Sequence, residues 1–96
     1  MEDKRQFNRW FREGDDQVVL SSSGSSQDIA RIVDVSVGGM RVTLHNKVNV
    51  GEEIYGQFNL LQFPYYVHGT VNRVFPSGKE WEIAIAFDKV SAIPIN

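Results

Sequence analysis

Trp81-Glu82-Ile83-Ala84-Ile85-Ala86-Phe87 is the stretch of the sequence that decides the fold class. Bulky apolar residues occupy its odd positions, and Glu82, Ala84 and Ala86 occupy the even ones. Successive side chains of a β-strand point to opposite faces, so this alternation predicts a strand with one face in a core. Trp81 lies at the start of the apolar face, which predicts a position in the core or at its rim.

Similar strand patterns occur along the rest of the chain, at Gln17–Leu20, Ile29–Val35, Met40–Leu44, Glu53–Leu61 and Tyr65–Phe75. The stretches between them predict loops or turns: Ser21–Ser26, Gly38-Gly39, Asn46–Gly51, Phe63-Pro64 and Pro76-Ser77-Gly78. Six strands with short connections in under 100 residues predict an all-β domain, a small six-stranded antiparallel β-barrel. Closure of the barrel would also remove exposed sheet edges.

The N-terminal segment has the only helical spacing, with Phe7, Trp10 and Phe11 at i, i+3 and i+4. Ten residues form at best a marginal helix in water. We therefore expect residues 1–12 to form a flexible N-terminal arm that becomes ordered on binding, and residues 13–96 to form the barrel. The short stretch after Phe87 contains Pro94 and predicts little or no C-terminal helix.

The composition is that of one globular domain: 96 residues, 42% of them hydrophobic and 23% charged. The sequence has no cysteine, which excludes disulfides, thiolate metal sites and a cysteine nucleophile. We expect a cytoplasmic protein with no transmembrane segment, because no apolar run is long enough to span a bilayer and the N-terminus lacks a secretory signal pattern.

Charge is unevenly distributed along the chain. The net charge of −2 counts against binding to a nucleic-acid polymer, because such domains usually carry a basic excess. Lys4, Arg5, Arg9 and Arg12 nevertheless lie within nine residues of one another. A local basic patch on a mildly acidic protein favours a small anion as ligand.

Two short clusters carry groups that could bind a guanine nucleotide. Arg5 and Arg9 are four residues apart, and Asp34-Val35-Ser36-Val37-Gly38-Gly39 combines a carboxylate, a hydroxyl and two glycines. Guanidinium groups fit phosphate oxygens and the guanine O6/N7 edge, and a carboxylate can accept from guanine N–H groups. Either cluster alone could be a solvated tail or an ordinary turn, so the hypothesis depends on their occurring together.

In combination, the R-x-x-x-R spacing of the first cluster and the D-x-S-x-x-G spacing of the second resemble the PilZ domain, a bacterial receptor for the second messenger cyclic di-GMP. Gly69–Val74 and Glu82–Phe87 resemble later strands of that family, so the resemblance extends from about Lys4 to Phe87. It implies a split six-stranded barrel that binds its ligand on the outer surface, assisted by a ligand-binding arm.

The resemblance also implies roles for individual residues. Arg5 and Arg9 would hold guanine and phosphate groups, Asp34 would accept from a guanine edge, and Ser36 would bond a phosphate or a base. Gly38 and Gly39 would leave room for the base and offer backbone N–H groups. Additional ligand contacts are expected from Lys4, Arg73 and Trp81. Because the arginines lie on a segment with weak intrinsic structure, we also expect ordering of the arm to signal to a downstream protein partner, which the sequence does not identify.

No pattern in the sequence indicates catalysis, a metal site or a cofactor. His45 and His68 lack nearby residues at ligand spacing, and Gly38-Gly39 is not followed by the Lys-Ser/Thr of a phosphate loop. The prediction is a non-enzymatic receptor. Two alternatives stay open at this point: a PilZ-like barrel that only binds protein, and a peripheral membrane module that uses Lys4–Arg12 as a basic amphipathic segment.

Overall fold

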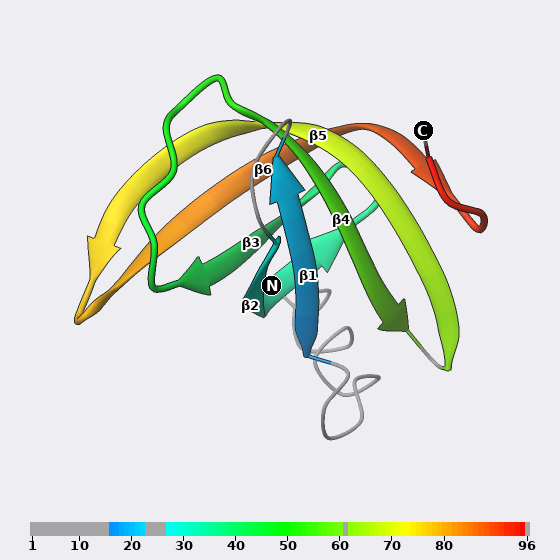
Figure 1. Ribbon diagram of the computed structural model, residues 1–96, viewed down its shortest axis with the longest axis horizontal. Coiled ribbons are helices and arrows are strands. Elements are labelled where there is room, and N and C mark those ends of the chain that lie inside the picture. The colour runs from blue at the N-terminus through cyan, green and yellow to red at the C-terminus, as the bar shows by residue number, and fades with distance from the viewer. Residues whose placement is uncertain (1–15, 23–26, 61, 96) are drawn as a thin grey trace.

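The computed structural model describes residues 16–22, 27–60 and 62–95, and these form a closed antiparallel barrel (Figure 1). Its strands are β1 (Gln17–Ser22), β2 (Gln27–Ser36), β3 (Gly39–Leu44), β4 (Glu53–Leu60), β5 (Phe63–Ser77) and β6 (Glu80–Ser91). Their order around the barrel is β1-β2-β3-β6-β5-β4, and β4 pairs with β1 to close it. The described residues include no helix. The structure therefore confirms the predicted all-β, six-stranded barrel.

The interior of the barrel is filled by apolar side chains from all six strands. Alternate positions point inward, as the period of two requires. Burying an aliphatic or aromatic side chain contributes about 1.5–3 kcal/mol, so this layer holds the barrel together. Its members are Val18, Leu20, Ala30, Ile32, Val35, Met40, Val42, Leu44, Ile54, Phe58, Val67, Val71, Ile83 and Ile85.

Register shifts in β2 and β5 change which of their residues face outward. On β2, Ile32 pairs with Val42 but Asp34 pairs with Arg41, so Val33 is an extra residue. On β5, Val71 pairs with Ile85 but Arg73 pairs with Ala84, so Asn72 is extra. Strict alternation would bury Asp34 in phase with Ile32, and Arg73 in phase with Val71. Each bulge reverses the phase and turns a charged side chain to the outer wall.

Two of the turns predicted between strands are wrong in position. Phe63 and Pro64 lie within β5, and the reversal before them includes Gln62, whose φ is 72°. Proline is tolerated there because it lies close to the start of the strand. Likewise Pro76 and Ser77 belong to the end of β5, and the turn is formed by Gly78 and Lys79. Gly78 has a φ of 64°, which favours glycine.

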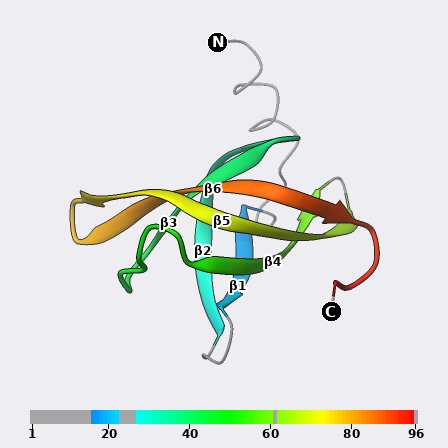
Figure 2. The ribbon, with the colours of Figure 1, turned by 90° about the horizontal axis from the view of Figure 1, so that it is seen from above.

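The strands β5 and β6 are longer than the sequence indicates. They form a hairpin whose tip extends beyond the barrel, as the view from above shows (Figure 2). At the other end of the chain, Ser21 and Ser22 belong to β1 rather than to a loop. The predicted arm, residues 1–12, lies outside the described residues, and the boundary after residue 12 stays a prediction.

Candidate functional site

Asp34 lies near the end of β2 with its carboxylate on the outer wall of the barrel. The bulge at Val33 places it there, whereas Ile32 and Val35 on either side of the bulge are buried. Only 16% of the Asp34 side chain is exposed. Partial shielding from water strengthens the electrostatic interactions of a carboxylate, so Asp34 is well placed for polar recognition.

Arg41 holds this carboxylate from the neighbouring strand β3. Its Nε and one terminal nitrogen contact the same oxygen of Asp34, Oδ2, at 3.1 and 2.5 Å. Its other terminal nitrogen contacts Oε2 of Glu82 on β6 at 3.4 Å. The hydrogen bond to Asp34, assisted by the charges of both carboxylates, raises the pKa of Arg41 above its ordinary value, although partial burial opposes this. Arg41 is therefore a permanent cation that orients Asp34.

Arg41 is not among the site residues predicted from the sequence. A signal for it existed, because a strand–turn–strand reading of Asp34–Leu44 places Arg41 across from the residues just before the turn. The bulge at Val33 obscured this signal, since strict alternation from Ile32 would place the Asp34 side chain on the inner face of the barrel. Side chains directly opposite each other in an antiparallel pair share a face and interact.

The turn from Ser36 to Gly39 joins β2 to β3 beside this ion pair. The Ser36 Oγ donates to the Gly39 carbonyl at 3.4 Å, and the Phe87 N–H donates to the Gly38 carbonyl at 2.9 Å. These bonds tie the turn to itself and to β6. Asp34, Ser36, Gly38 and Gly39 thus lie together at one corner of the outer wall.

The two glycines of the turn differ in their surroundings. A Cβ on Gly39 would lie 2.3 Å from the Ile85 carbonyl oxygen, so the close approach of β3 to β6 requires glycine there. A Cβ on Gly38 would meet nothing within 4 Å, and Gly38 has no positive φ. Packing of the described residues therefore explains Gly39 but not Gly38. An open glycine on a pinned turn leaves space for a ligand to approach the main chain.

The outer wall next to this corner carries small side chains flanked by cations. Ala86 pairs with Gly39, and Ala84 pairs with Arg41 on one side and Arg73 on the other. Neighbouring strands are about 4.8 Å apart, so the backbones of Arg41 and Arg73 are about 10 Å apart. Arg73 is exposed on the same face. The structure thus places Arg73 within reach of a ligand that lies across Ala84.

Trp81 lies at the opposite end of the β3–β6 ladder. Leu44 pairs with Trp81, whereas Gly39 pairs with Ala86, so about 17 Å of strand separates Trp81 from the Ser36–Gly39 turn. The Lys47 Nζ lies 5.1 Å from the centre of its ring. Trp81 is half-buried at the rim, and the structure does not bring it together with Asp34 and Ser36.

Lys4, Arg5 and Arg9 lie outside the described residues, but the point at which their segment joins the barrel is known. The Asp16 carbonyl accepts from the Ile32 N–H at 2.6 Å, and Gln17 pairs with Arg31. The segment therefore joins beside β2, two residues before Asp34. Arg9 is seven residues from Asp16, a distance of up to about 25 Å when extended.

The sequence as a whole is similar to a known family. A family model of the PilZ domain matches residues 3–95, nearly the whole chain. The chain belongs to the PilZ domain family. PilZ domains are, in general, cyclic di-GMP receptors and a binding family rather than an enzyme family. No curated protein matches this PilZ domain.

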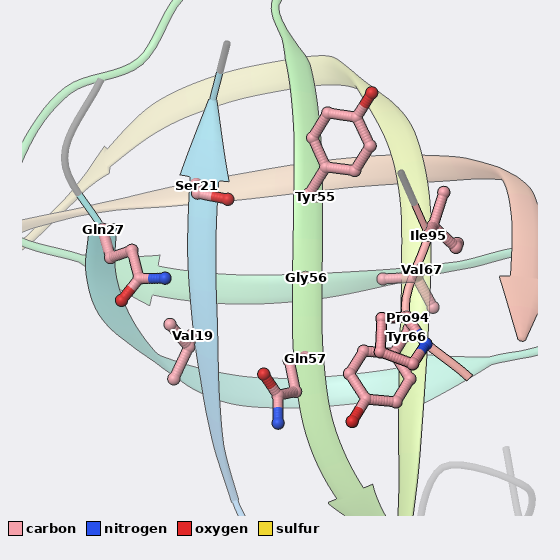
Figure 3. A pocket seen from close by; sticks show the side chains of 10 residues that line it. All are labelled: Val19, Ser21, Gln27, Tyr55, Gly56, Gln57, Tyr66, Val67, Pro94 and Ile95. Carbon is pink, nitrogen blue, oxygen red and sulfur yellow. The ribbon is translucent and has the colours of Figure 1, made fainter. Parts of the chain in front are cut away.

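Other features of this PilZ domain do not indicate a ligand site for an anion. A hollow of about 270 Å³ lies over β1, β4 and β5 (Figure 3). Its lining includes Tyr55, Gln57 and Tyr66 but no charged side chain, so it offers no cation to a phosphate. Within residues 16–22, 27–60 and 62–95, no group of three or more histidine, aspartate or glutamate side chains has an arrangement that could hold a metal ion. No helix in the same ranges is long and apolar enough to cross a membrane.

Proposed function

We propose that this PilZ domain is a cytoplasmic cyclic di-GMP receptor whose ligand lies on the outer wall, between the Asp34 corner and the N-terminal arm. The observation that carries the proposal is the position of Asp16, which follows the arm in the sequence. Asp16 is bonded to β2 only two residues from Asp34, so the R-x-x-x-R and D-x-S-x-x-G clusters can reach the same ligand.

Each group at the proposed site matches a part of the ligand. Arg5 and Arg9 supply guanidinium groups for the two phosphates and the O6/N7 edge of guanine. Asp34, oriented by Arg41, accepts from the guanine N–H donors. Ser36 bonds a phosphate or base edge, and the open Gly38 lets the base approach the backbone. Lys4 and Arg73 add positive charge at the margins.

The proposed output is a change in the N-terminal arm. Ligand binding would order residues 1–12 against the barrel and present a new surface to a downstream protein. A change of this kind from disorder to order is a common switch. Ordering the arm costs conformational entropy, and contacts with the ligand must offset that cost. The two arginines supply those contacts.

Isothermal titration calorimetry with cyclic di-GMP tests the proposal. The full chain should bind, and Arg9→Ala should weaken binding tenfold or more, because a good bidentate contact is worth about 1–3 kcal/mol. Arg31→Ala is the matched control, because it removes an arginine of β2 that is not among the proposed ligand contacts. The Arg31 side chain is 75% exposed, and its Nε lies 3.9 Å from Oδ2 of Asp16. Absence of binding heat from folded protein contradicts the proposal, and equal effects of the two substitutions contradict the role of Arg9.

A further inference from the structure

An apolar hollow of about 220 Å³ opens at one end of the barrel, beside the Ser36–Gly39 turn. We call it the apolar mouth. It lies where β2 and β4 end, where β5 begins and where β6 approaches its end. Its lining includes Val35, Phe58, Leu60, Tyr65, Phe87 and Val90. Ser36 and Val37 of the turn also line it, so the apolar mouth and the proposed ligand site share a wall.

The described part of the chain starts at this mouth, with Asp16 and the first residues of β1. The first pairs of β1 are Gln17 with Arg31 of β2 and Val18 with Phe58 of β4. Both partner strands continue past these pairs, to Ser36 and Leu60, and their continuations form two walls of the mouth. Asp16, through which the preceding segment of the chain joins the barrel, therefore lies between the two strands whose ends wall the apolar mouth.

Trp10 is the residue of that segment best suited to enter the mouth. It is six residues from Asp16, which is about 20 Å of extended chain or about 9 Å of helix, so it reaches the mouth in either form. Arg5 and Arg9, four residues apart, share a face in a strand and nearly so in a helix, and Trp10 lies off that face in both. Trp10 can thus face the barrel while the arginines face a ligand.

We propose that the Trp10 indole occupies the apolar mouth when cyclic di-GMP binds and anchors the arm there. The proposal rests on the proposed function and adds the place where the arm docks. A cavity of about 150 Å³ holds benzene, so 220 Å³ suits the larger indole. The hydroxyls of Ser36 and Tyr65 can accept the indole N–H, as a buried tryptophan requires. Docking of Trp10 also brings Arg9, its neighbour in sequence, to the Ser36 wall.

Tryptophan fluorescence tests this docking, because the chain has only two tryptophans. Trp81→Phe in the full chain leaves Trp10 as the single emitter. Saturating cyclic di-GMP should shift its emission to shorter wavelength and reduce its acrylamide quenching constant at least twofold. Val90→Asp, at a mouth residue that is 48% exposed, should abolish both changes. Ile29→Asp is the matched control, since Ile29 is 66% exposed and does not line the mouth.

The outcomes separate the docking from the function. Calorimetric binding with an unchanged quenching constant overturns the docking alone, and so do equal effects of Val90→Asp and Ile29→Asp. Protection of Trp10 that grows with protein concentration assigns the occupant to a second copy and also overturns docking within one chain. Absence of binding heat overturns the proposed function, and with it the docking.

Discussion

Two clusters on the barrel wall have the same plan, a cation between two carboxylates beside a bulge. In one, Arg41 lies between Asp34 and Glu82. In the other, His68 lies between Asp88 and Glu53, with Nδ1 to Asp88 Oδ1 at 2.6 Å and Nε2 to Glu53 Oε1 at 3.4 Å. His68 of β5 pairs with Lys89 of β6, and Gly69 pairs with Phe87, so Asp88 is an extra residue in β6.

The difference between the clusters lies in the central cation. Arginine stays charged at any physiological pH, so the arrangement around Asp34 does not depend on pH. Histidine titrates near neutral pH, so the arrangement around His68 does. The hydrogen bond to Asp88, followed by that to Glu53, raises the pKa of His68. The cluster proposed to bind ligand is thus the one with the permanent charge.

The glycines beside the clusters should give the largest effects on stability. A Cβ on Gly69 would lie 2.3 Å from the Ala86 carbonyl oxygen, and a Cβ on Gly39 would lie 2.3 Å from that of Ile85. We expect Gly69→Ala and Gly39→Ala each to lower the free energy of unfolding by about 1–3 kcal/mol, measured by urea denaturation. Gly38→Ala is the control and should change it by less than about 0.5 kcal/mol. Equal values for Gly39→Ala and Gly38→Ala would show that β3 is not pressed against β6.

Removal of one carboxylate from each cluster should separate the clusters by function. Asp34→Ala deletes the proposed acceptor for guanine and should weaken cyclic di-GMP binding tenfold or more, about 1.4 kcal/mol. Asp88→Ala deletes the corresponding carboxylate beside His68 and should leave the affinity within twofold. Calorimetry on both variants measures this. If Asp88→Ala weakens binding as strongly as Asp34→Ala, the site is misplaced.

A double-mutant cycle should show that Arg41 acts through Asp34. Arg41→Ala should lower the affinity about threefold to tenfold in the natural chain, because Asp34 loses the two hydrogen bonds that Arg41 donates to it. In an Asp34→Asn background the same substitution should have little further effect, which gives a coupling energy of about 0.5–1.5 kcal/mol. Arg73→Ala serves as the comparison, since its effect should add to that of Asp34→Asn. Additive behaviour of Arg41→Ala would instead indicate a direct contact with ligand.

The His68 cluster should make a small, pH-dependent contribution to stability. Because the folded-state pKa is raised above the ordinary 6.5, the contribution is fully present below about pH 6.5 and is lost as pH rises through the folded-state pKa. We expect it to amount to about 1 kcal/mol or less, since both carboxylates are more than half exposed. Urea denaturation between pH 5.5 and about 8.5 should show this slope in the natural chain and not in His68→Gln. A slope that persists in His68→Gln belongs to another group.

The sequence was sufficient for the fold because alternation is a strong signal. The Ile83–Ile85–Phe87 face predicts an inward side of β6, and both isoleucines are buried. Val67, Gly69 and Val71 share a face of β5 in the same way. Strand ends were less predictable, since Pro64 can occupy the start of β5 at little cost.

The site could be predicted only in part, because the bulges are not visible in the sequence. An extra residue at Val33 turns the Asp34 side chain outward, and an extra residue at Asn72 turns the Arg73 side chain outward. Neither residue type marks a bulge. Trp81 shares a strand face with Ile83, but only the register shows that it lies at the far end from Gly39. The roles of Lys4, Arg5 and Arg9 stay predictions.

Paramagnetic relaxation tests most directly whether the arm and the Asp34 corner meet around one ligand. The chain has no cysteine, so Asn8→Cys provides a single site for a spin label. With cyclic di-GMP bound, the label should broaden the amide signals of Ser36, Gly38 and Gly39 and leave those of Gly78 and Lys79 sharp. Saturation with ligand that leaves the Ser36–Gly39 signals as sharp as those of Gly78 would contradict the account.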